Sequence, residues 1–264
     1  MKRVVLLTTL WRRHALERFV LGYYRDWELP GIELLRVAVG SEGKASKGRA
    51  IDNGWTYVEA ANCPLSMKHQ AGFDAVRELD PDYVVLINSD DLLSKNYFAA
   101  VTGACAPDDV LALADLWFLD LRSSLVALGY FPGYRQTKVK GVRSGVFERD
   151  NLTLGAGRCF GRVALDEVDW QLWVEDIDRG LDGSCADRLL AAAGKQIQAH
   201  SMSELGVFAM DVKSGVNLWN FKDYKYGSVL RGGAVESVLA SHGMAGILRI
   251  SDCGFRNELC GDGT

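Results

Sequence analysis

The sequence predicts an α/β fold in which helices flank both faces of a mostly parallel sheet. Short apolar runs, of the kind found in strands buried on both faces, recur along the first 120 residues. Segments with apolar residues at helical spacing separate these runs, and such alternation is typical of parallel sheets. Hydrophobic residues make up 48% of the 264 residues and charged residues 24%, which excludes a disordered, collagen-like or coiled-coil chain.

Each element has its own local signal. The run Val4 to Thr9 is aliphatic and β-branched, and a helix follows it with apolar residues at helical spacing. Pro64 opens another helix, where its missing N–H costs nothing, and Asp80-Pro81 ends it, because a residue before proline avoids helical angles. The expected elements are strand 4–9, helix 14–27, strand 34–39, strand 56–59, helix 64–79 and strand 83–87.

Charge and cysteine usage indicate an ordinary globular protein, which we expect in the cytoplasm. The net charge of −4 and pI of 5.6 do not suggest a nucleic-acid coat protein. The six cysteines show no CxxC spacing, so we expect reduced, mostly buried thiols. The apolar run at the start ends at Arg12-Arg13 without a cleavage site, and no stretch approaches the ~20 apolar residues of a membrane span.

Residues 122–162 differ from the rest of the chain. They hold eight Lys or Arg residues and two acidic residues, a local net charge of +6, with several glycines, tyrosines and phenylalanines. We expect a long loop or hairpin over one face. It is either a solvated surface loop or a surface that contacts an anion.

Candidate ligand-binding residues follow the predicted strands, because ligands of such sheets bind beyond the carboxyl ends of the strands. These positions are Thr8-Thr9, Ser41-Glu42 and Asn88-Ser89-Asp90-Asp91. Adjacent carboxylates at Asp90 and Asp91 suit a hard divalent cation that bridges a diphosphate. The alternative is a plain turn, since Asn, Ser and Asp also cap helices, and one is expected to start near Ser94.

With these motifs in place, the chain resembles the GT-A glycosyltransferases, especially the family-2-like members. The helix beginning Lys68-His69-Gln70-Ala71-Gly72 precedes a strand and then Asn88-Ser89-Asp90-Asp91, which is similar to the D-x-D(-D) motif of that family. The resemblance implies the GT-A (Rossmann-like) fold as a single domain. Residues 1–120 would form the nucleotide-sugar-binding half and 121–264 the acceptor-binding half.

The same resemblance assigns metal ligands. Asp90 matches the second aspartate of D-x-D, with Asp91 beside it, and Asn88 replaces the first, where a neutral amide weakens cation binding. A late histidine often completes the metal site in the family, which makes His200 a candidate after a strand expected over 195–199. The alternative for His200 is a structural role.

A general base is also implied, since family-2 enzymes carry an E-D pair with an arginine six residues after the Asp. Glu175-Asp176 matches by letters, but Arg188 stands six residues after Asp182, so the spacing favours Asp182. Asp182 could instead cap a helix. Lys68 either helps hold the diphosphate or is a solvated helix residue. The expected donor-binding residues are Thr8, Thr9, Ser41, Glu42, Lys68, Asn88 and Ser89. The polar segment 210–219 looks like part of the site but has no assigned role.

The expected activity is therefore transfer of a sugar from a nucleotide-sugar, with UDP the expected nucleotide, to an acceptor hydroxyl by a hexosyltransferase-type enzyme with Mn²⁺ or Mg²⁺. The basic stretch with its aromatic residues suits a DNA backbone and a flipped base, so hydroxymethylated pyrimidines of bacteriophage DNA are one acceptor class. The expected location is then the cytoplasm of a bacterial or phage-infected host cell. Saccharides, proteins and small molecules are others. A nucleotidyltransferase is a second possible class, although the turn after the first strand lacks the glycines of a phosphate loop. A non-catalytic binding module is a third.

Overall fold

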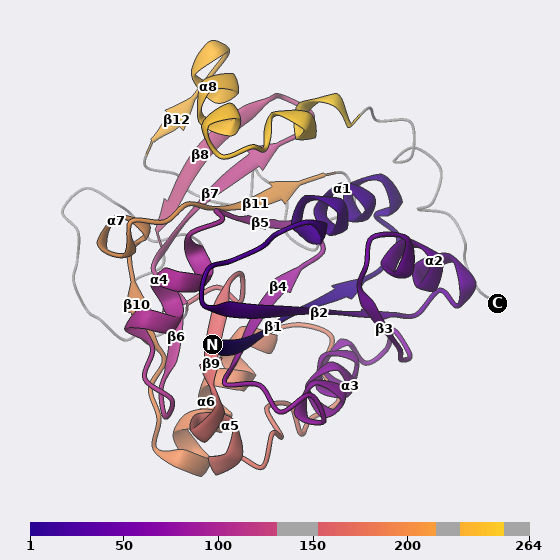
Figure 1. Ribbon diagram of the computed structural model, residues 1–264, viewed down its shortest axis with the longest axis vertical. Coiled ribbons are helices and arrows are strands. Elements are labelled where there is room, and N and C mark those ends of the chain that lie inside the picture. Colours follow the sequence, from indigo (N-terminus) through magenta and orange to yellow (C-terminus); the bar gives the residue numbers. More distant parts are fainter. Residues whose placement is uncertain (131–152, 215–227, 251–264) are drawn as a thin grey trace.

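The computed structural model describes residues 1–130, 153–214 and 228–250. Its large sheet consists of β1 (Lys2–Leu10), β2 (Ile32–Gly40), β3 (Thr56–Glu59), β4 (Tyr83–Asn88), β6 (Val110–Leu113), β9 (Arg158–Gly161) and β10 (Gln198–His200). The strand order is β10-β6-β9-β4-β1-β2-β3 (Figure 1). All pairs are parallel except the two made by β9, which runs antiparallel between β4 and β6. The prediction of a mostly parallel α/β sheet is confirmed.

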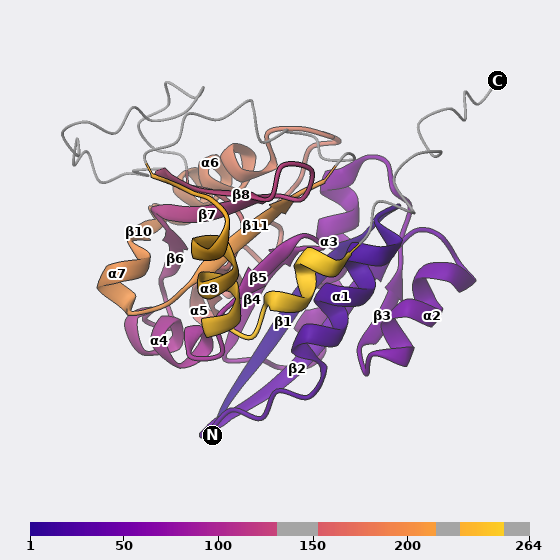
Figure 2. The ribbon, with the colours of Figure 1, turned by 90° about the horizontal axis from the view of Figure 1, so that it is seen from above.

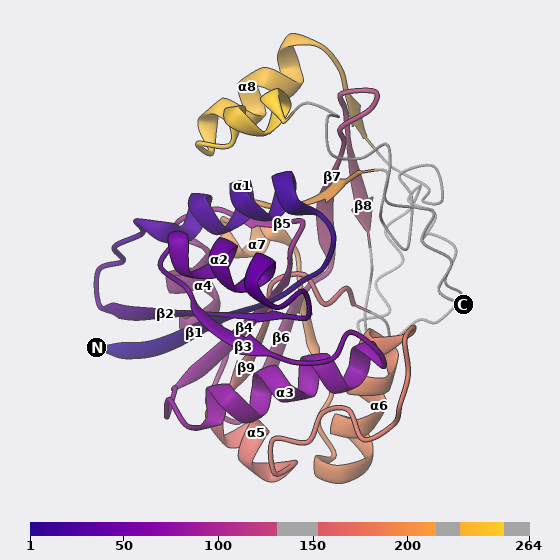
Figure 3. The ribbon, with the colours of Figure 1, turned by 90° about the vertical axis from the view of Figure 1, so that its right-hand side faces the viewer.

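Helices cover both faces of this sheet. On one face lie α1 (His14–Arg25), α2 (Lys44–Asp52) and α4 (Tyr97–Ala104), and on the other lie α3 (Leu65–Arg77), α5 (Arg162–Glu167) and α6 (Leu181–Ala193) (Figure 3). Alternate side chains of β1 enter the two cores: Val4 and Leu6 pack on the α1 side, Val5 and Leu7 on the α3 side. A strand buried on both faces in this way must be apolar throughout. This continuous apolar run allowed the strand to be predicted from the sequence.

A second, smaller sheet was not predicted. It contains β5 (Asp91–Leu93), β7 (Asp115–Asp120), β8 (Leu125–Tyr130), β11 (Ala209–Lys213) and β12 (Val229–Leu230), in the order β12-β8-β7-β11-β5. Its buried residues join the core on the α1 side of the large sheet. Because β5 begins only three residues after β4 ends, the two sheets meet where the carboxylate pair lies.

Three further short helices complete the described part of the chain: α7 (Met202–Leu205), α8 (Gly233–Ser241) and a 3₁₀ helix, η2 (Ala245–Arg249). Figures 2 and 3 show α8 and η2 over α1. The hydroxyl of Tyr23 in α1 donates to the carbonyl of His242 at 3.1 Å, so the C-terminal segment packs on the first helix. Within the described ranges, no helix has both the length and the apolar character needed to cross a bilayer.

Most predicted elements lie where expected, and the differences have local causes. The helix after Pro64 begins at Leu65, with Pro64 as its N-cap residue, and ends at Arg77. α2 was missed because its sequence, KASKGRAID, is small and polar and carries no apolar stripe. The strand expected over 195–199 is β10, and His200 is its last residue.

The expectation of a long loop or hairpin over one face at 122–162 holds for only part of the described residues, since β8 forms a hairpin with β7 but β9 lies inside the large sheet. β8 and β9 lie within this range, and Arg158 is fully buried in β9 at the centre of the large sheet. Arg162 pairs with Asp80 and Asp166 on the surface. The other basic residues of the stretch are Arg122, which is exposed, and five that lie outside the described residues, Arg135, Lys138, Lys140, Arg143 and Arg149.

Candidate functional site

Three aspartates meet where the two sheets join. Asp91 opens β5 and lies opposite Asp211 of β11 in the antiparallel register, and Asp90 directly precedes it. One carboxylate oxygen from each lies within 4.8 Å of the others, and all three side chains are buried. Among the residues that the structure describes, no second group of His, Cys, Asp or Glu has this arrangement. Carboxylate oxygens are the ligands that Mg²⁺ and Mn²⁺ prefer.

In Asp91 and in Asp211, one carboxylate oxygen accepts hydrogen bonds from protein donors and the other has no such donor in the described structure. Asp91 Oδ2 accepts from the backbone N–H of Asn88 at 2.6 Å and from its side-chain amide at 3.0 Å. Asp211 Oδ2 accepts from Lys213 Nζ at 2.6 Å. Asp91 Oδ1 and Asp211 Oδ1 are buried and have no hydrogen-bond partner in the described structure. Burying an unsatisfied oxygen is costly, so these two atoms fit a cation.

Burial and the nearby negative charges disfavour the ionised forms of Asp91 and Asp211. Burial raises the pKa of Asp91 well above its usual range, and the charges of Asp90 and Asp211 raise it further. Burial also raises the pKa of Asp211, while Lys213 opposes that rise. A divalent cation among the carboxylates would favour their ionised forms.

Within the described part of the chain, two side-chain cations pair with the aspartate cluster. Arg13, at the start of α1, pairs through Nη1 with Asp90 Oδ2. Lys213 pairs with Asp211, and its ammonium also lies 5.3 Å from the centroid of the Phe118 ring. Among the residues that the structure describes, three carboxylates and two side-chain cations therefore share this site.

The predicted donor-binding residues of β1 and β4 lie beside the aspartate cluster along the sheet. Thr9 aligns with Asn88 in the parallel register of β1 and β4. Thr8 is fully buried, and its hydroxyl has no hydrogen-bond partner in the part of the chain described. Ser89 is also buried. Since the side-chain amide of Asn88 binds Asp91, Asn88 shapes the aspartate loop.

Lys68 is buried, with 1% of its surface exposed, which contradicts the solvated alternative considered for it. Its ammonium donates to Leu10 O at 2.7 Å, Ser41 Oγ at 3.0 Å and Asn62 Oδ1 at 3.1 Å, which uses all three N–H groups. Burial lowers the pKa of Lys68 to about 8. Lys68 thus joins the carboxyl end of β1 to the segments that follow β2 and β3, and so shapes this edge of the sheet.

Glu42 belongs to a network of charged side chains. It contacts His14 Nε2 at 2.9 Å and Arg49, which also pairs with the fully buried Glu17 at 2.7 Å. Burial would raise the pKa of Glu42, but the hydrogen bond from His14 and the charge of Arg49 hold it below its ordinary value.

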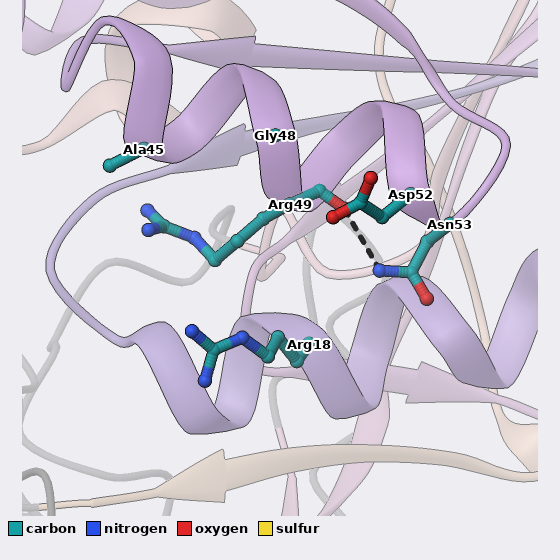
Figure 4. Close-up of a pocket in the computed structure, with 6 residues that line it drawn as sticks. All are labelled: Arg18, Ala45, Gly48, Arg49, Asp52 and Asn53. Carbon is teal, nitrogen blue, oxygen red and sulfur yellow. Dashed lines mark hydrogen bonds between the residues drawn. The ribbon is translucent and has the colours of Figure 1, made fainter.

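A cavity of about 320 Å³ opens next to this network, between α1 and α2. Figure 4 shows Arg18 of α1 and Arg49 of α2 extending along it. None of the three aspartates lines this cavity. It is therefore separate from the aspartate cluster.

Asp182 lies near the end of β4. It is the second residue of α6, whose N-cap is Gly180 in a left-handed conformation, so the capping role considered for it is wrong. Its carboxylate packs on Gly155, where an added Cβ would lie 2.5 Å from Asp182 Oδ1. That turn is fixed at the end of β4 by the N–H of Gly157, which donates to Leu86 O at 2.8 Å.

The arginine beside Asp182 is not the one suggested by the spacing. Arg158 Nη2 lies 3.6 Å from Asp182 Oδ1, whereas Arg188 donates to Gln171 O. Arg158 is fully buried, so Asp182 is the acidic partner of an internal cation. Partial burial raises the pKa of Asp182, and Arg158 opposes this rise.

Glu175 and Asp176 lie in an exposed segment at the start of α3. The hydroxyl of Ser66 donates to Glu175 O at 2.7 Å, and Asp178 accepts from the N–H of Leu65 at 2.8 Å. The structure thus places this pair beside α3 and does not bring it to the aspartate cluster.

His200 is not part of the aspartate cluster either. It ends β10 at the edge of the sheet, three strands from β4, which corresponds to roughly 14 Å at the usual strand spacing. Its Nδ1 lies 3.8 Å from Glu204. The third carboxylate comes instead from Asp211, within the polar segment 210–219 that had no assigned role.

Comparison with known proteins identifies the fold. No protein-family model matches the chain, and its sequence has no significant match among curated proteins. The mannosyltransferase PcManGT from Pyrobaculum calidifontis, solved with GDP-Man and Mn²⁺, is 15% identical with a TM-score of 0.50, over 82% of this chain and 58% of that one. S. aureus TarS 1–349 with UDP is 13% identical (TM-score 0.47; 81% and 61% covered), and 4-diphosphocytidyl-2C-methyl-D-erythritol synthase is 12% identical (0.46; 76% and 88%).

The architecture is therefore GT-A-like, as the resemblance in the sequence implied. At this identity the similarity shows the fold alone. The chain spans 58% of the length of the mannosyltransferase structure.

Proposed function

We propose that this protein is a metal-assisted glycosyltransferase that uses a nucleotide-sugar donor. The observation that carries the proposal is the aspartate cluster, with its two unpartnered buried oxygens, at the carboxyl edge of a GT-A-like sheet. The mannosyltransferase of similar fold was solved with GDP-Man and Mn²⁺, which supports the same pairing of ligands here.

Asp90, Asp91 and Asp211 hold the cation, Mn²⁺ or Mg²⁺. When bound, the cation neutralises the negative charge that develops on the departing diphosphate. The donor, a UDP-sugar, lies beyond the carboxyl ends of the neighbouring strands, near Thr9 and Ser41. Asn88 keeps Asp91 in place through its two N–H groups.

Asp182 is the proposed general base. Transfer requires removal of a proton from the acceptor hydroxyl, and a carboxylate with a raised pKa accepts a proton more readily at neutral pH. Arg158 and the Gly155 backbone fix one side of this carboxylate. The side chain is 42% exposed, so an acceptor can reach it. Glu175 and Asp176 are the alternative bases.

A nucleotidyltransferase is the second candidate activity. The segment after β1 counts against it, because Trp11-Arg12-Arg13 leads directly into α1 without a glycine-rich phosphate loop. A binding module without activity is the third candidate. It would bind the nucleotide-sugar donor without turning it over.

Four acceptor classes are considered: DNA that carries hydroxymethylated pyrimidines, saccharides, proteins and small molecules. The case for DNA came from the basic stretch 122–162. Arg158 is buried and Arg162 is paired, so both are unavailable to a phosphate backbone. The case therefore depends on Arg122, which is exposed, and on the basic residues within 131–152.

The test is release of nucleoside diphosphate from UDP-glucose, UDP-GlcNAc and GDP-mannose, with Mn²⁺ and with EDTA. We expect metal-dependent release of UDP that Asp211→Asn abolishes. Formation of a nucleotide-sugar from a sugar phosphate and UTP would instead identify a nucleotidyltransferase. Binding of UDP-sugar without turnover, even with every acceptor class present, would identify a binding module.

A further inference from the structure

We infer that Arg13 is the resident counter-ion of the aspartate cluster, that a divalent cation displaces it from Asp90, and that it then binds the donor diphosphate. The second half rests on the proposed function. The inference starts from the direct ion pair between the Arg13 guanidinium and Asp90, one of the three proposed metal ligands.

The position of Arg13 allows its side chain to move while its backbone stays fixed. Arg13 is the N-cap residue of α1, which follows the carboxyl end of β1. Its N–H donates to Glu17 Oε1 at 3.3 Å, and its carbonyl accepts from the N–H of Glu17 at 2.7 Å. These contacts do not involve the guanidinium, whose side chain is 16% exposed.

Lys213, which pairs with Asp211, is less free to move than Arg13. It lies within β11, is 5% exposed and packs over the ring of Phe118. Its partner, Asp211, is also influenced by Arg13, whose charge lowers the pKa of that carboxyl. The charge of Arg13 therefore acts on two members of the aspartate cluster, and Arg13 is the cation that can leave.

Exchange of partners follows from charge. A divalent ion that binds Asp90 competes with the guanidinium for the same carboxylate, so the metal alone binds more weakly than it would without Arg13. A donor diphosphate supplies a new anionic partner, which a guanidinium binds with two parallel N–H groups. Metal and nucleotide then strengthen each other's binding. The metal releases Arg13 from Asp90 so that it can bind the diphosphate, and the diphosphate holds Arg13 away from the carboxylate that the metal binds.

The experiment measures Mn²⁺ affinity by the electron paramagnetic resonance signal of free Mn²⁺, with and without UDP. The wild-type protein, Arg13→Ala, Arg13→Lys and Arg18→Ala are compared. Arg18→Ala is the matched control, since it removes the same charge from an exposed position of α1. Arg13→Lys keeps the charge. A change in metal affinity that appears in Arg13→Ala but not in Arg13→Lys is therefore due to loss of the charge and not to misfolding.

We expect Arg13→Ala to bind Mn²⁺ at least ~10-fold more tightly than the wild type without UDP, because the competing cation is gone. UDP should raise the Mn²⁺ affinity of the wild type at least ~10-fold but that of Arg13→Ala less than ~3-fold, because the diphosphate contact is lost. Arg18→Ala should stay within about threefold of the wild type in both measurements. Arg13→Lys should do so without UDP, because it keeps the charge, but UDP should enhance its Mn²⁺ binding less than that of the wild type, because an ammonium lacks the paired N–H groups.

Equal Mn²⁺ affinity of Arg13→Ala and the wild type without UDP would overturn the inference and leave the proposed function standing. Tighter Mn²⁺ binding with unchanged enhancement by UDP would overturn the diphosphate contact. Failure of both the wild type and Arg13→Ala to bind Mn²⁺, with or without UDP, would overturn the proposed metal site itself.

Discussion

Asp91 and Asp211 lie directly opposite each other in the antiparallel pairing of β5 and β11, and both side chains are buried. Like charges at opposed positions of a sheet repel, and burial increases the cost of holding them. One oxygen of each has no hydrogen-bond partner within the described structure. The fold thus brings together two acids that a cation between them would stabilise.

Asn88→Asp should destabilise the metal-free protein. The Asn88 side-chain amide donates to Asp91 Oδ2 at 3.0 Å, and a carboxylate there would repel Asp91. We expect the free energy of unfolding in EDTA to fall by about 1–3 kcal/mol, and saturating Mn²⁺ to restore most of it. Urea denaturation measures both values. Asn88→Ala, the control, loses the hydrogen bond without adding charge, so equal recovery of both variants with Mn²⁺ would contradict the prediction.

Asp182→Asn separates a catalytic from a structural role. If Asp182 is the base, Asp182→Asn should lower kcat by roughly 10² to 10⁴-fold. The KM for the donor should change little. Because Arg158 is buried beside it, the variant should also lose about 1 kcal/mol of stability. Steady-state kinetics well below the melting temperature measures the rate. A stability loss with unchanged kcat would make Asp182 only the partner of Arg158.

His69 should make the protein less stable in acid. It is 5% exposed beside Trp173, and burial, with a smaller effect of Lys68, lowers its pKa from 6.5 to about 4. Between these values the unfolded chain binds more protons than the folded one, so stability falls as pH falls from 6.5 towards 4. The full effect is about 3 kcal/mol. His69→Phe keeps a ring without the titrating group.

Urea denaturation between pH 7 and pH 4 checks this prediction. The free energy of unfolding of His69→Phe should fall less steeply than that of the wild type over this range. Parallel curves for the two proteins would show that His69 titrates with the same pKa in both states.

The strands of the large sheet could be predicted because burial on both faces makes β1 and β4 apolar throughout. The position of Asp90 and Asp91 followed from the strand before them. Asp211 could not be identified, since its pairing with Asp91 depends on a second sheet assembled from distant segments. The hydrogen bonds of Lys68 could not be predicted from the sequence either, because its three acceptors come from three separate parts of the chain.

Calorimetric titration of UDP into the wild-type protein and Asp211→Asn, each with Mn²⁺ and with EDTA, tests most directly whether the three aspartates bind a cation that holds the donor. Wild-type protein should bind UDP at least ~10-fold more tightly with Mn²⁺, and Asp211→Asn, which keeps the size of the side chain, should lose that enhancement. Circular dichroism confirms that the variant is folded. Equal UDP affinity of the wild type in Mn²⁺ and EDTA, or an undiminished enhancement in folded Asp211→Asn, would contradict a metal site at Asp90, Asp91 and Asp211.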